Sequence, residues 1–478
     1  LRRRQFLAGM NIEDLELILH PMVEDIKEAV GSMGDDTPTA VLSDKYRPMS
    51  HFFRQNFSQV TNPPIDSLRE SEVMSLKTRF GNTGNILDFE NLTEDNIYVL
   101  DSPILSNSQF EKFLDFFKED IKVLDCTFNF DESLKKRLDE LRLEAEIAVR
   151  EGSKHLILTD KGTNKKKIPV PMTLSIGAIN SRLTDLGIRG FASINVQASD
   201  VLDTHSFAVL LGVGATTINS YIAFDSIFQR YEKGLFGKIT YEECVKRYVR
   251  SVDNGLLKIM SKMGISVLSA YRGGCNFEAV GLSRSLMADY FPTMTSRISG
   301  IGLPGLEKRT LEVHKKGFDE DIITLPIGGF YRYRKGGDRH AFEATSIHML
   351  QSAVGSDSYS TYKKYSEIIN NHGPINIRDL LNYKSNRKSV TIDKVESINE
   401  IRKKLASPSI SFGALSPEAH ETLSIAMNRI GAKSGSGEGG EDPERFIPRV
   451  NGDNPSSAIK QIASARFGVT AEYLNNCK

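Results

Sequence analysis

The sequence has no excess of charge of either sign and no long apolar run. Its 61 Lys and Arg residues balance 61 Asp and Glu residues, so no field of one sign attracts the chain to nucleic acid or to an anionic membrane surface. No apolar run approaches the ~18 residues that a membrane-spanning helix needs. A hydrophobic content of 40% and a charged content of 26% are instead typical of a globular protein in water. We therefore expect neither nucleic acid nor a membrane as a partner.

Cysteine is also scarce, and its spacing excludes two kinds of site. The four cysteines, Cys126, Cys244, Cys275 and Cys477, lie far apart and form no C-x-x-C pair. This pattern argues against a secreted disulfide framework and offers no metal-ligand spacing. We expect no metal site and a reducing compartment, the cytoplasm. No signal peptide is expected, because acidic residues from Glu13 onward interrupt any apolar leader segment.

The length of the chain predicts more than one domain. At ~100–200 residues per domain, the 478 residues suggest two to four. After Pro326 the composition changes to a basic, glycine-containing stretch, residues 331–340, and we place a domain boundary near residue 325. The chain begins with Leu1 and ends with Lys478 without recognisable terminal features, so we expect a piece of a longer protein.

Short β-branched runs alternate with helical patterns from residue 96 onward. This alternation predicts an α/β fold with a parallel-type sheet and helices. The clearest helix spans residues 131–150, where apolar residues recur every three to four positions and Asp131 is available as N-cap. A helical opening is expected over residues 12–30. The predicted strands are residues 97–100, 121–124, 155–158, 191–196, 207–211 and 265–268.

A second βα unit is expected near the end of the sequence. It combines a strand over residues 409–413, a helix over residues 417–430 with Pro417 in its first turn, and the glycine-rich residues 433–441. The glycines would let backbone N–H groups approach an anion or a flat cofactor. A flexible linker explains the same composition equally well. Neither the Walker sequence nor the dinucleotide fingerprint is present.

A lysine, a hydroxyl and an arginine are grouped within residues 457–468. In a helix, Lys460 and Ser464 would share one face at positions i and i+4, with Arg466 close by. Two cations that converge in a cleft suit a dicarboxylate. An amphipathic surface helix is the alternative, and the acidic Glu438 nearby favours the binding site.

Three further features are interpreted as structural. The glycines Gly212 and Gly214 lack the third glycine of a nucleotide fingerprint and predict a tight strand-to-helix turn. His205 is expected to be a satisfied core or turn histidine. Cys275 has no neighbour in the sequence that would activate it as a nucleophile.

Several stretches together resemble the large subunit of the glutamate synthase family, and the resemblance covers nearly all 478 positions. Any one stretch alone would be unspecific, whereas the set is highly specific. Residues 197–200, His205 and Ser206 depart from the family pattern in details of one surface. The matching stretches are residues 32–38, 59–66, 278–282, 410–416, 436–442 and 459–470.

The resemblance implies a two-part architecture. Residues 1–325 would form a central connecting domain, and residues 326–478 the N-terminal part of an FMN-binding (β/α)8 barrel. The family makes L-glutamate from glutamine and 2-oxoglutarate: an amidotransferase domain releases ammonia, an internal tunnel carries it, and FMN reduces the resulting 2-iminoglutarate.

The resemblance also assigns roles to residues near the end of the chain. Glu438 and Lys460 would be catalytic. Lys460, Ser464 and Arg466 would bind 2-oxoglutarate. The residues placed against the flavin would be Ser411, Phe412, Gly413 and Ala414.

Other parts of the family architecture are expected outside this sequence. The amidotransferase nucleophile would precede Leu1, and the cysteine ligands of an iron–sulfur cluster, the later barrel strands and a C-terminal domain would follow Lys478. The residues after Pro408 would supply about two of eight βα units, so the isolated chain is expected to be inactive and to hold only part of the FMN site. The electron donor is left open between ferredoxin and a nicotinamide-oxidising small subunit. The alternative function is a non-catalytic connector or scaffold domain that binds no cofactor.

Overall fold

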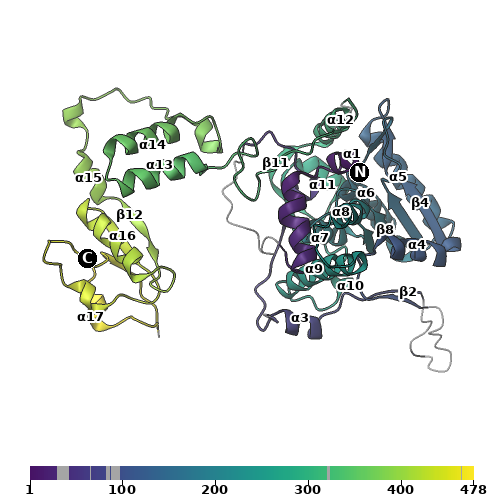
Figure 1. Ribbon diagram of the computed structural model, residues 1–478, viewed down its shortest axis with the longest axis horizontal. Coiled ribbons are helices and arrows are strands. Elements are labelled where there is room, and N and C mark those ends of the chain that lie inside the picture. Colours follow the sequence, from purple (N-terminus) through teal and green to yellow (C-terminus); the bar gives the residue numbers. More distant parts are fainter. Residues whose placement is uncertain (29–41, 65, 82–86, 88–96, 320–322, 465) are drawn as a thin grey trace. The chain divides into compact units, whose positions relative to one another are not determined.

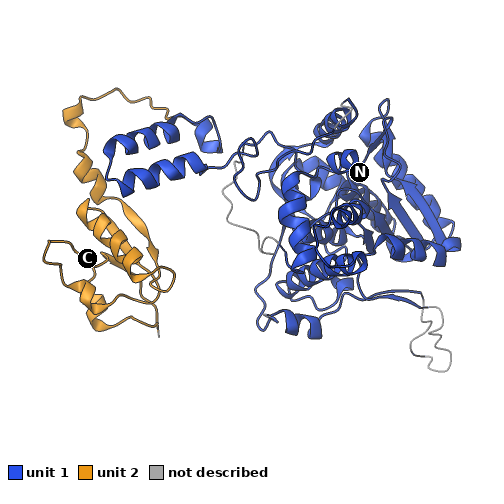
Figure 2. Cartoon of the chain, viewed as in Figure 1, with its two compact units in different colours: residues 1–381 blue, residues 382–478 orange. Residues whose placement is uncertain are grey.

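The computed structural model describes the chain except residues 29–41, 65, 82–86, 88–96, 320–322 and 465. The chain divides into two compact units, residues 1–381 and residues 382–478 (Figure 2). The family-like stretch at residues 32–38 lies outside the described residues. Each unit is built around parallel strands and helices, as the α/β prediction required.

The first unit contains a four-stranded parallel sheet in the order β4-β6-β8-β9 (Figure 1). Helices lie between successive strands in the sequence, which is how parallel neighbours are connected. The strands are β4 (Ile121–Asp125), β6 (His155–Thr159), β8 (Ser193–Gln197) and β9 (Thr217–Asn219), and the intervening helices are α5 (Leu134–Arg150), α6 (Met172–Asp185) and α7 (Thr204–Val213). The strand predictions at β4, β6 and β8 are confirmed.

Smaller sheets and further helices complete the first unit. One sheet has the order β1-β10-β11, β2 pairs with β3, and β5 pairs with β7. These strands are β1 (Phe53–Gln55), β2 (Thr78–Phe80), β3 (Tyr98–Leu100), β5 (Thr127–Asn129), β7 (Lys167–Pro169), β10 (Phe277–Leu282) and β11 (Thr295–Ile301). The helices are α1 (Arg2–Leu7), α2 (His20–Glu24), α3 (Ser67–Val73), α4 (Asn107–Phe116), α8 (Tyr221–Glu232), α9 (Tyr241–Ser261), α10 (Leu268–Tyr271), α11 (Arg284–Tyr290), α12 (Leu303–Asp319), α13 (Ala344–Gly355) and α14 (Tyr359–Asn371).

Helix α5 shows how apolar spacing fixes a packed face. Its start differs from the expected one, because Ser133 and not Asp131 caps the helix: the Ser133 hydroxyl accepts a hydrogen bond from the Lys136 N–H at 3.2 Å. This bond satisfies one of the unpaired donors of the first turn. The apolar residues that recur at helical spacing and are fully buried are Leu134, Leu138, Leu141 and Ala145.

The strand expected over residues 207–211 is wrong, because these residues lie in α7. A continuous apolar run suits a buried helix as well as a buried strand. Here Asp203 caps the helix by accepting a hydrogen bond from the Ser206 N–H at 2.9 Å. Gly214 ends the helix with φ of 135°, and a Cβ there would lie 2.5 Å from the Asn180 side chain. The glycine pair therefore marks a helix end, not the expected strand-to-helix turn.

Two other expected elements also differ from the structure. Residues 265–268 form no strand beyond one bridge between Val267 and Ser75. The helical opening is divided into a π-helix, Asp14–Leu19, and α2. Pro21 has no N–H to donate, so the hydrogen-bond pattern of a continuous helix is interrupted there.

A buried carboxylate joins the beginning of the first unit to a segment 316 residues later. Glu13 accepts hydrogen bonds from the backbone N–H groups of Gly329, Phe330, Tyr331 and Arg332 at 2.7 to 3.2 Å. Four donors occupy both carboxylate oxygens, which offsets the cost of removing the charge from water.

The second unit contains a three-stranded parallel sheet in the order β12-β13-β14. The Ser416 hydroxyl accepts a hydrogen bond from the Ala419 N–H at 3.3 Å and caps α16, which confirms the helix expected there. The sequence predicted about two βα units in this region, and the structure has a third parallel strand, β14, after them. The elements are β12 (Ala406–Ile410), β13 (Lys433–Ser436), β14 (Ile459–Lys460), α15 (Ile398–Lys403), α16 (Pro417–Arg429) and α17 (Ala471–Asn475).

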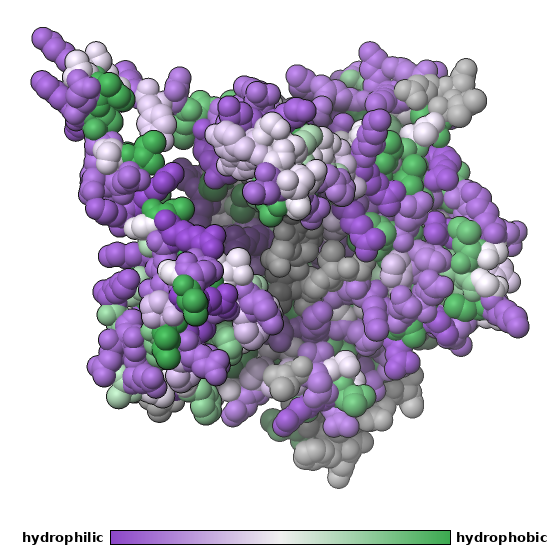
Figure 3. Space-filling view, turned by 60° about the vertical axis from the view of Figure 1, so that its left-hand side comes forward, coloured by the Kyte–Doolittle hydropathy of each residue, from purple (hydrophilic) through white to green (hydrophobic). Residues whose placement is uncertain are grey.

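The surface in Figure 3 is mostly hydrophilic, and apolar residues form small groups on this face. Scattered apolar residues of this kind are normal on protein surfaces. Among the described residues, no helix has both the length and the apolar character needed to cross a bilayer.

We expect Leu138→Ala to lower the free energy of unfolding of the first unit by ~2–5 kcal/mol, because it leaves a cavity in the core. Leu138 is fully buried on α5, whereas Leu143 on the same helix is 56% exposed. Leu143→Ala is therefore the matched control and should change stability by less than ~0.5 kcal/mol. Urea unfolding followed by circular dichroism measures both, and equal losses would contradict the assigned packing face.

Candidate functional site

The three parallel strands of the second unit end side by side. In the sheet register, Ile410 of β12 is opposite Ser436 of β13, and Ser436 is opposite Lys460 of β14. The segments that follow these residues therefore emerge at one edge of the sheet. In barrels and open sheets built from parallel strands, this carboxyl edge is where ligands bind.

The predicted flavin-contacting residues form a turn after β12, in which Ser411 and Phe412 are half-buried and Gly413 and Ala414 are exposed. The Ala414 N–H donates to the Ser411 carbonyl at 3.0 Å, and the Ser411 hydroxyl donates to the carbonyl of Glu438 in the segment after β13. A Cβ added at Gly413 or Gly439 would meet no atom closer than 3.8 and 3.7 Å. Gly413 and Gly439 thus present backbone without crowding, which is compatible with a flat ring, whereas Gly437 and Gly440 pack closely against neighbouring backbone.

Glu438 and Arg466 are brought together at this edge. Their side chains form an ion pair although they lie after different strands. The hydrogen bond from the guanidinium and its charge hold the pKa of Glu438 below its ordinary value. Ser464 lies in an exposed turn of the same segment as Arg466. Three of the residues predicted from the sequence therefore follow the ends of β13 and β14.

The described residues of 457–468 contain no helix, which is a correction to the expected i, i+4 face. Lys460 is the last residue of β14 because its backbone pairs with Ser436. Its side chain is completely buried and forms an ion pair with Glu441. The Lys460 ammonium also lies 3.3 Å from the Ser456 hydroxyl and 4.8 Å from the centre of the Phe446 ring. Lys460 and Ser464 share no helix face.

The sequence analysis missed the residues that surround Lys460. Glu441 accepts a hydrogen bond from the Ser457 N–H at 3.0 Å and forms a second ion pair, with Arg445, at 3.2 Å. Glu441 stands at the end of the glycine-rich stretch, and Arg445 follows four residues later. The charged residues directly after the glycines were the one sequence signal for this cluster. That Glu441 pairs with the buried Lys460 could not be recognised from the spacing of the two residues.

The chain's cysteines do not fit an iron–sulfur cluster. Such clusters are held by cysteine thiolates in most proteins. Cys126 and Cys244 are buried, Cys275 is partly buried and Cys477 is exposed, and all four are free. Within the part of the chain that the structure describes, no group of three His, Cys, Asp or Glu residues could hold a metal ion.

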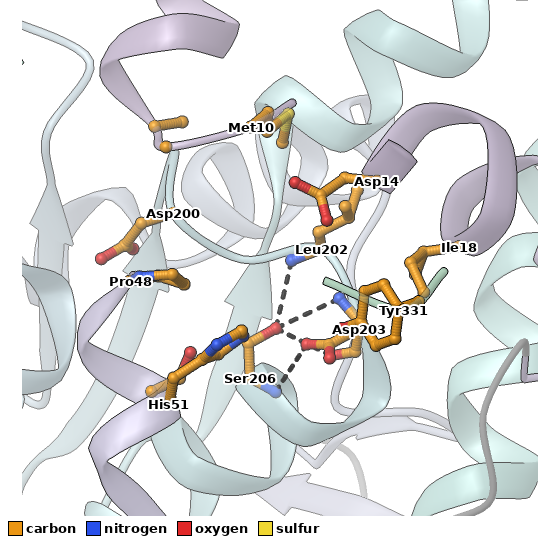
Figure 4. Close-up of a pocket in the computed structure, with 13 residues that line it drawn as sticks. Met10, Asp14, Ile18, Pro48, His51, Asp200, Leu202, Asp203, Ser206 and Tyr331 are labelled. Atoms are coloured by element: carbon orange, nitrogen blue, oxygen red, sulfur yellow. Dashed lines mark hydrogen bonds between the residues drawn. The ribbon is translucent and has the colours of Figure 1, made fainter. Parts of the chain in front are cut away.

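The first unit has a small cavity of about 40 Å³ beside the start of α7, lined by apolar and ionisable side chains (Figure 4). Asp14, Asp200, Asp203 and His51 are among its lining residues. A space of this size has room for a few water molecules and not for a flavin or a dicarboxylate. The dashed lines in Figure 4 mark the hydrogen bonds of Ser206 with Asp203 and with the Leu202 N–H, which close the first turn of α7.

Burial changes the ionisation of the groups in this cavity. It raises the pKa of Asp14 to about 7, and it raises the pKa of Asp200 to about 7 with a further contribution from the charge of Asp160. Burial lowers the pKa of His51 to about 4. One oxygen of Asp200 accepts from the Met172 N–H at 3.2 Å, and its other oxygen has no hydrogen-bond partner among the residues that the structure describes.

These features define an α/β protein whose candidate site lies at the carboxyl edge of parallel strands, as in β/α barrel enzymes. Residues 3–283 match the family model for the glutamate synthase central domain, and residues 340–478 match the model for a conserved region in glutamate synthase. The chain belongs to the glutamate synthase family. The resemblance expected from the sequence is confirmed.

Curated relatives support the same family. The chain is 58% identical over its whole length to the glutamate synthase [NADPH] large chain of Azospirillum brasilense, of which it covers 32%. It is 40% identical to the corresponding protein of Bacillus subtilis (strain 168), covering 31%, and 38% identical to the ferredoxin-dependent glutamate synthase of Pyropia yezoensis, covering 33%. The chain spans about a third of the length of these relatives.

We expect Asp200→Asn to stabilise the first unit at pH 8 and not at pH 4. The folded-state pKa of about 7 lies above the value of ~4 for an unfolded chain, so the folded state retains a proton that the unfolded state releases. The destabilisation grows as the pH rises from ~4 through the folded-state pKa. The variant should therefore gain roughly 1–3 kcal/mol at pH 8.

Urea unfolding at the two pH values measures this difference. Asp185→Asn, at an exposed position of α6, is the control for a general effect of removing one negative charge. A gain for Asp200→Asn that is the same at pH 4 and pH 8 would show that ionisation of this carboxyl is not the cause.

Proposed function

We propose that this chain is part of a glutamate synthase, which makes L-glutamate from glutamine-derived ammonia and 2-oxoglutarate. Residues 1–325 would be the central connecting domain, and residues 326–478 the N-terminal part of the FMN domain. The observation that supports the site most directly is the register of Ile410, Ser436 and Lys460. It gathers the candidate residues of three segments at one edge.

The turn after β12 is the proposed flavin contact. Ser411, Phe412, Gly413 and Ala414 would lie against one part of the isoalloxazine, where the backbone at Gly413 leaves room for a flat ring. Bound FMN supplies the electrons that reduce an imine to an amine. The Ser411 hydroxyl fixes the turn to the segment after β13 through the Glu438 carbonyl.

Arg466 and Glu438 are proposed to bind the substrate and to handle a proton. An arginine forms two parallel hydrogen bonds with a carboxylate, so a carboxylate of 2-oxoglutarate would compete with Glu438 for Arg466. Glu438 would then lose the contact that lowers its pKa, and its carboxyl oxygen would take up a proton more readily. A carboxyl group prepared in this way suits a proton donor for imine reduction.

Lys460 and Ser464 complete the proposed site. Lys460 forms an ion pair with Glu441. We therefore expect it to contribute to substrate binding as a fixed positive charge beneath the strand ends. That charge favours the approach of a dianionic substrate. The exposed hydroxyl of Ser464 is available to donate a hydrogen bond to a substrate oxygen.

The electron donor is proposed to be reduced nicotinamide, oxidised by a partner subunit. The NADPH-type relatives are 58% and 40% identical to this chain, whereas the ferredoxin-dependent relative from Pyropia yezoensis is 38% identical. The iron–sulfur cluster, the amidotransferase nucleophile and the remaining barrel strands would come from other parts of the parent protein.

A connector role is proposed for residues 1–325. Many of their buried side chains form one extensive hydrophobic core, and the small cavity beside α7 has room for a few water molecules and not for the substrate or the cofactor. A domain with its own core can link its neighbours without taking part in the chemistry.

In the full-length large subunit, Lys460→Ala and Arg466→Ala should each raise the KM for 2-oxoglutarate by roughly ten- to hundredfold, because each removes a charge that favours the dianion. Glutamine hydrolysis should continue, since it occurs in a separate domain. Steady-state kinetics with 2-oxoglutarate varied at saturating glutamine gives the result.

Lys433→Ala is the matched control, because Lys433 is exposed at the amino end of β13, the opposite edge of the sheet. It should leave the KM for 2-oxoglutarate unchanged. If both site variants behaved like this control, the residues after β13 and β14 would not be the substrate site.

A further inference from the structure

A continuous set of buried polar side chains lies below the candidate site in the second unit. It runs from Lys460 through Glu441 and Arg445 to His420, and it ends at the carbonyl of Ile410. The two ends of this set are the last residue of β14 and the last residue of β12. Candidate site residues follow each strand: Ser411 comes directly after β12, and Ser464 and Arg466 lie a few residues after β14.

Glu441 is the first link. Its carboxylate contacts the Lys460 ammonium through one oxygen, while the other oxygen lies 3.2 Å from the Arg445 guanidinium. The side chains of Lys460 and Glu441 are completely inaccessible, and that of Arg445 is 7% exposed. A carboxylate shared by two buried cations fixes the distance between them, because leaving either one unpaired is strongly unfavourable.

Arg445 is the second link, and its contacts leave it little freedom. Its Nη2 donates to the Ser424 hydroxyl at 3.0 Å and to the Pro455 carbonyl at 2.8 Å. Its Nη1 lies 2.7 Å from Nδ1 of His420. Because the guanidinium is planar and contacts both Glu441 and His420, the position of Glu441 determines the position of the histidine ring.

His420 is the third link, and its two nitrogens have opposite roles. A guanidinium can only donate, so Nδ1 of His420 accepts from Arg445, and Nε2 donates to the Ile410 carbonyl at 2.9 Å. This arrangement requires the neutral ring with its hydrogen on Nε2. The ring also meets Phe412 edge-on, with 6.1 Å between centroids. His420 thus contacts the residues on both sides of Ser411.

The charges of the set do not cancel. Lys460 and Arg445 carry two positive charges, Glu441 carries one negative charge, and His420 is neutral in the arrangement described. The four side chains sum to one positive charge, part of which the nearby carboxylates of Glu421 and Asp442 offset through their attraction for Arg445. An anion bound at that edge would gain from it, and the gain would depend on where Glu441 and Arg445 hold the charges.

We infer that Glu441, Arg445 and His420 form a positioning network that couples the flavin-contacting turn after β12 to Lys460 at the end of β14. This inference rests on the proposed function of the edge as the meeting place of FMN and 2-oxoglutarate. None of the three residues needs to touch the substrate. They set the position of the flavin-contacting turn relative to the buried charge of Lys460, and a misplacement of about 1 Å can cost ~100-fold in rate.

The experiment perturbs one end of the network and measures the other end. The FMN-loaded, full-length large subunit is reduced with dithionite, and flavin reoxidation by 2-oxoglutarate with ammonium chloride is followed by stopped flow. His420→Gln can keep a donor for the Ile410 carbonyl, but it has no acceptor at the position of Nδ1, where Arg445 is held. It should raise the 2-oxoglutarate concentration for half-maximal rate roughly tenfold. Glu441→Gln should shift the absorbance spectrum of the bound flavin.

Arg445→Lys retains the charge but cannot contact Glu441 and His420 together, so it should produce both effects. Arg429→Ala is the control: Arg429 lies on α16 with His420 but pairs with Asp453 at the surface, and neither readout should change. FMN content and melting temperature are measured for every variant, so that loss of cofactor or of fold is separated from loss of positioning.

The outcomes are distinct. Variants that lower only the melting temperature, with half-saturation and flavin spectrum as in the wild type, would reduce the network to a stabiliser of the fold and overturn the inference. If Glu441→Gln does not fold, the half-saturation concentration of His420→Gln alone decides whether the inference holds. A wild-type protein that binds FMN but whose reduced flavin is not reoxidised by 2-oxoglutarate and ammonium would instead refute the proposed function, and the inference with it.

Discussion

The carboxyl edge of the second unit depends on the buried carboxylate of Glu441. Strand β14 has only two residues, and its pairing with β13 covers only two register positions, so backbone hydrogen bonds alone hold it weakly. Glu441 adds an ion pair to Lys460 and a hydrogen bond from the Ser457 N–H, both at or next to this strand. Loss of one partner of a buried charge pair costs ~3–5 kcal/mol. The sheet edge and the charge pattern of the site are therefore consequences of the same interaction.

Much of the fold could be predicted from the sequence where local signals agree with the tertiary structure. The helices α5 and α16 and the strands β4, β6 and β8 were predicted because apolar periodicity, capping residues and β-branched runs are local properties. Helix α7 was missed since an apolar run that is buried on all sides has no periodicity to read. The division of the helical opening at Pro21 was missed because the run of apolar residues continues across it.

The site was predictable only in part, and for a similar reason. The proximity of Glu438 and Arg466 followed from the resemblance to a family, and the structure brings both side chains into one ion pair. The surroundings of Lys460 were not predicted, because its partner Glu441 precedes it by 19 residues and meets it only when β13 and β14 pair. His420 gave no signal at all, since its role is defined by two contacts to other segments.

The contact between Glu13 and residues 329–332 has a consequence for the order of events during synthesis. The donors that satisfy this carboxylate are encoded 316 residues after it. At ~5–20 residues per second, a ribosome needs roughly 15 to 60 s to reach them. Until then the backbone donors that pair with Glu13 are not part of the chain, and its carboxylate can be satisfied only by water or by other groups. This one contact of the first unit therefore cannot form before translation has passed Arg332.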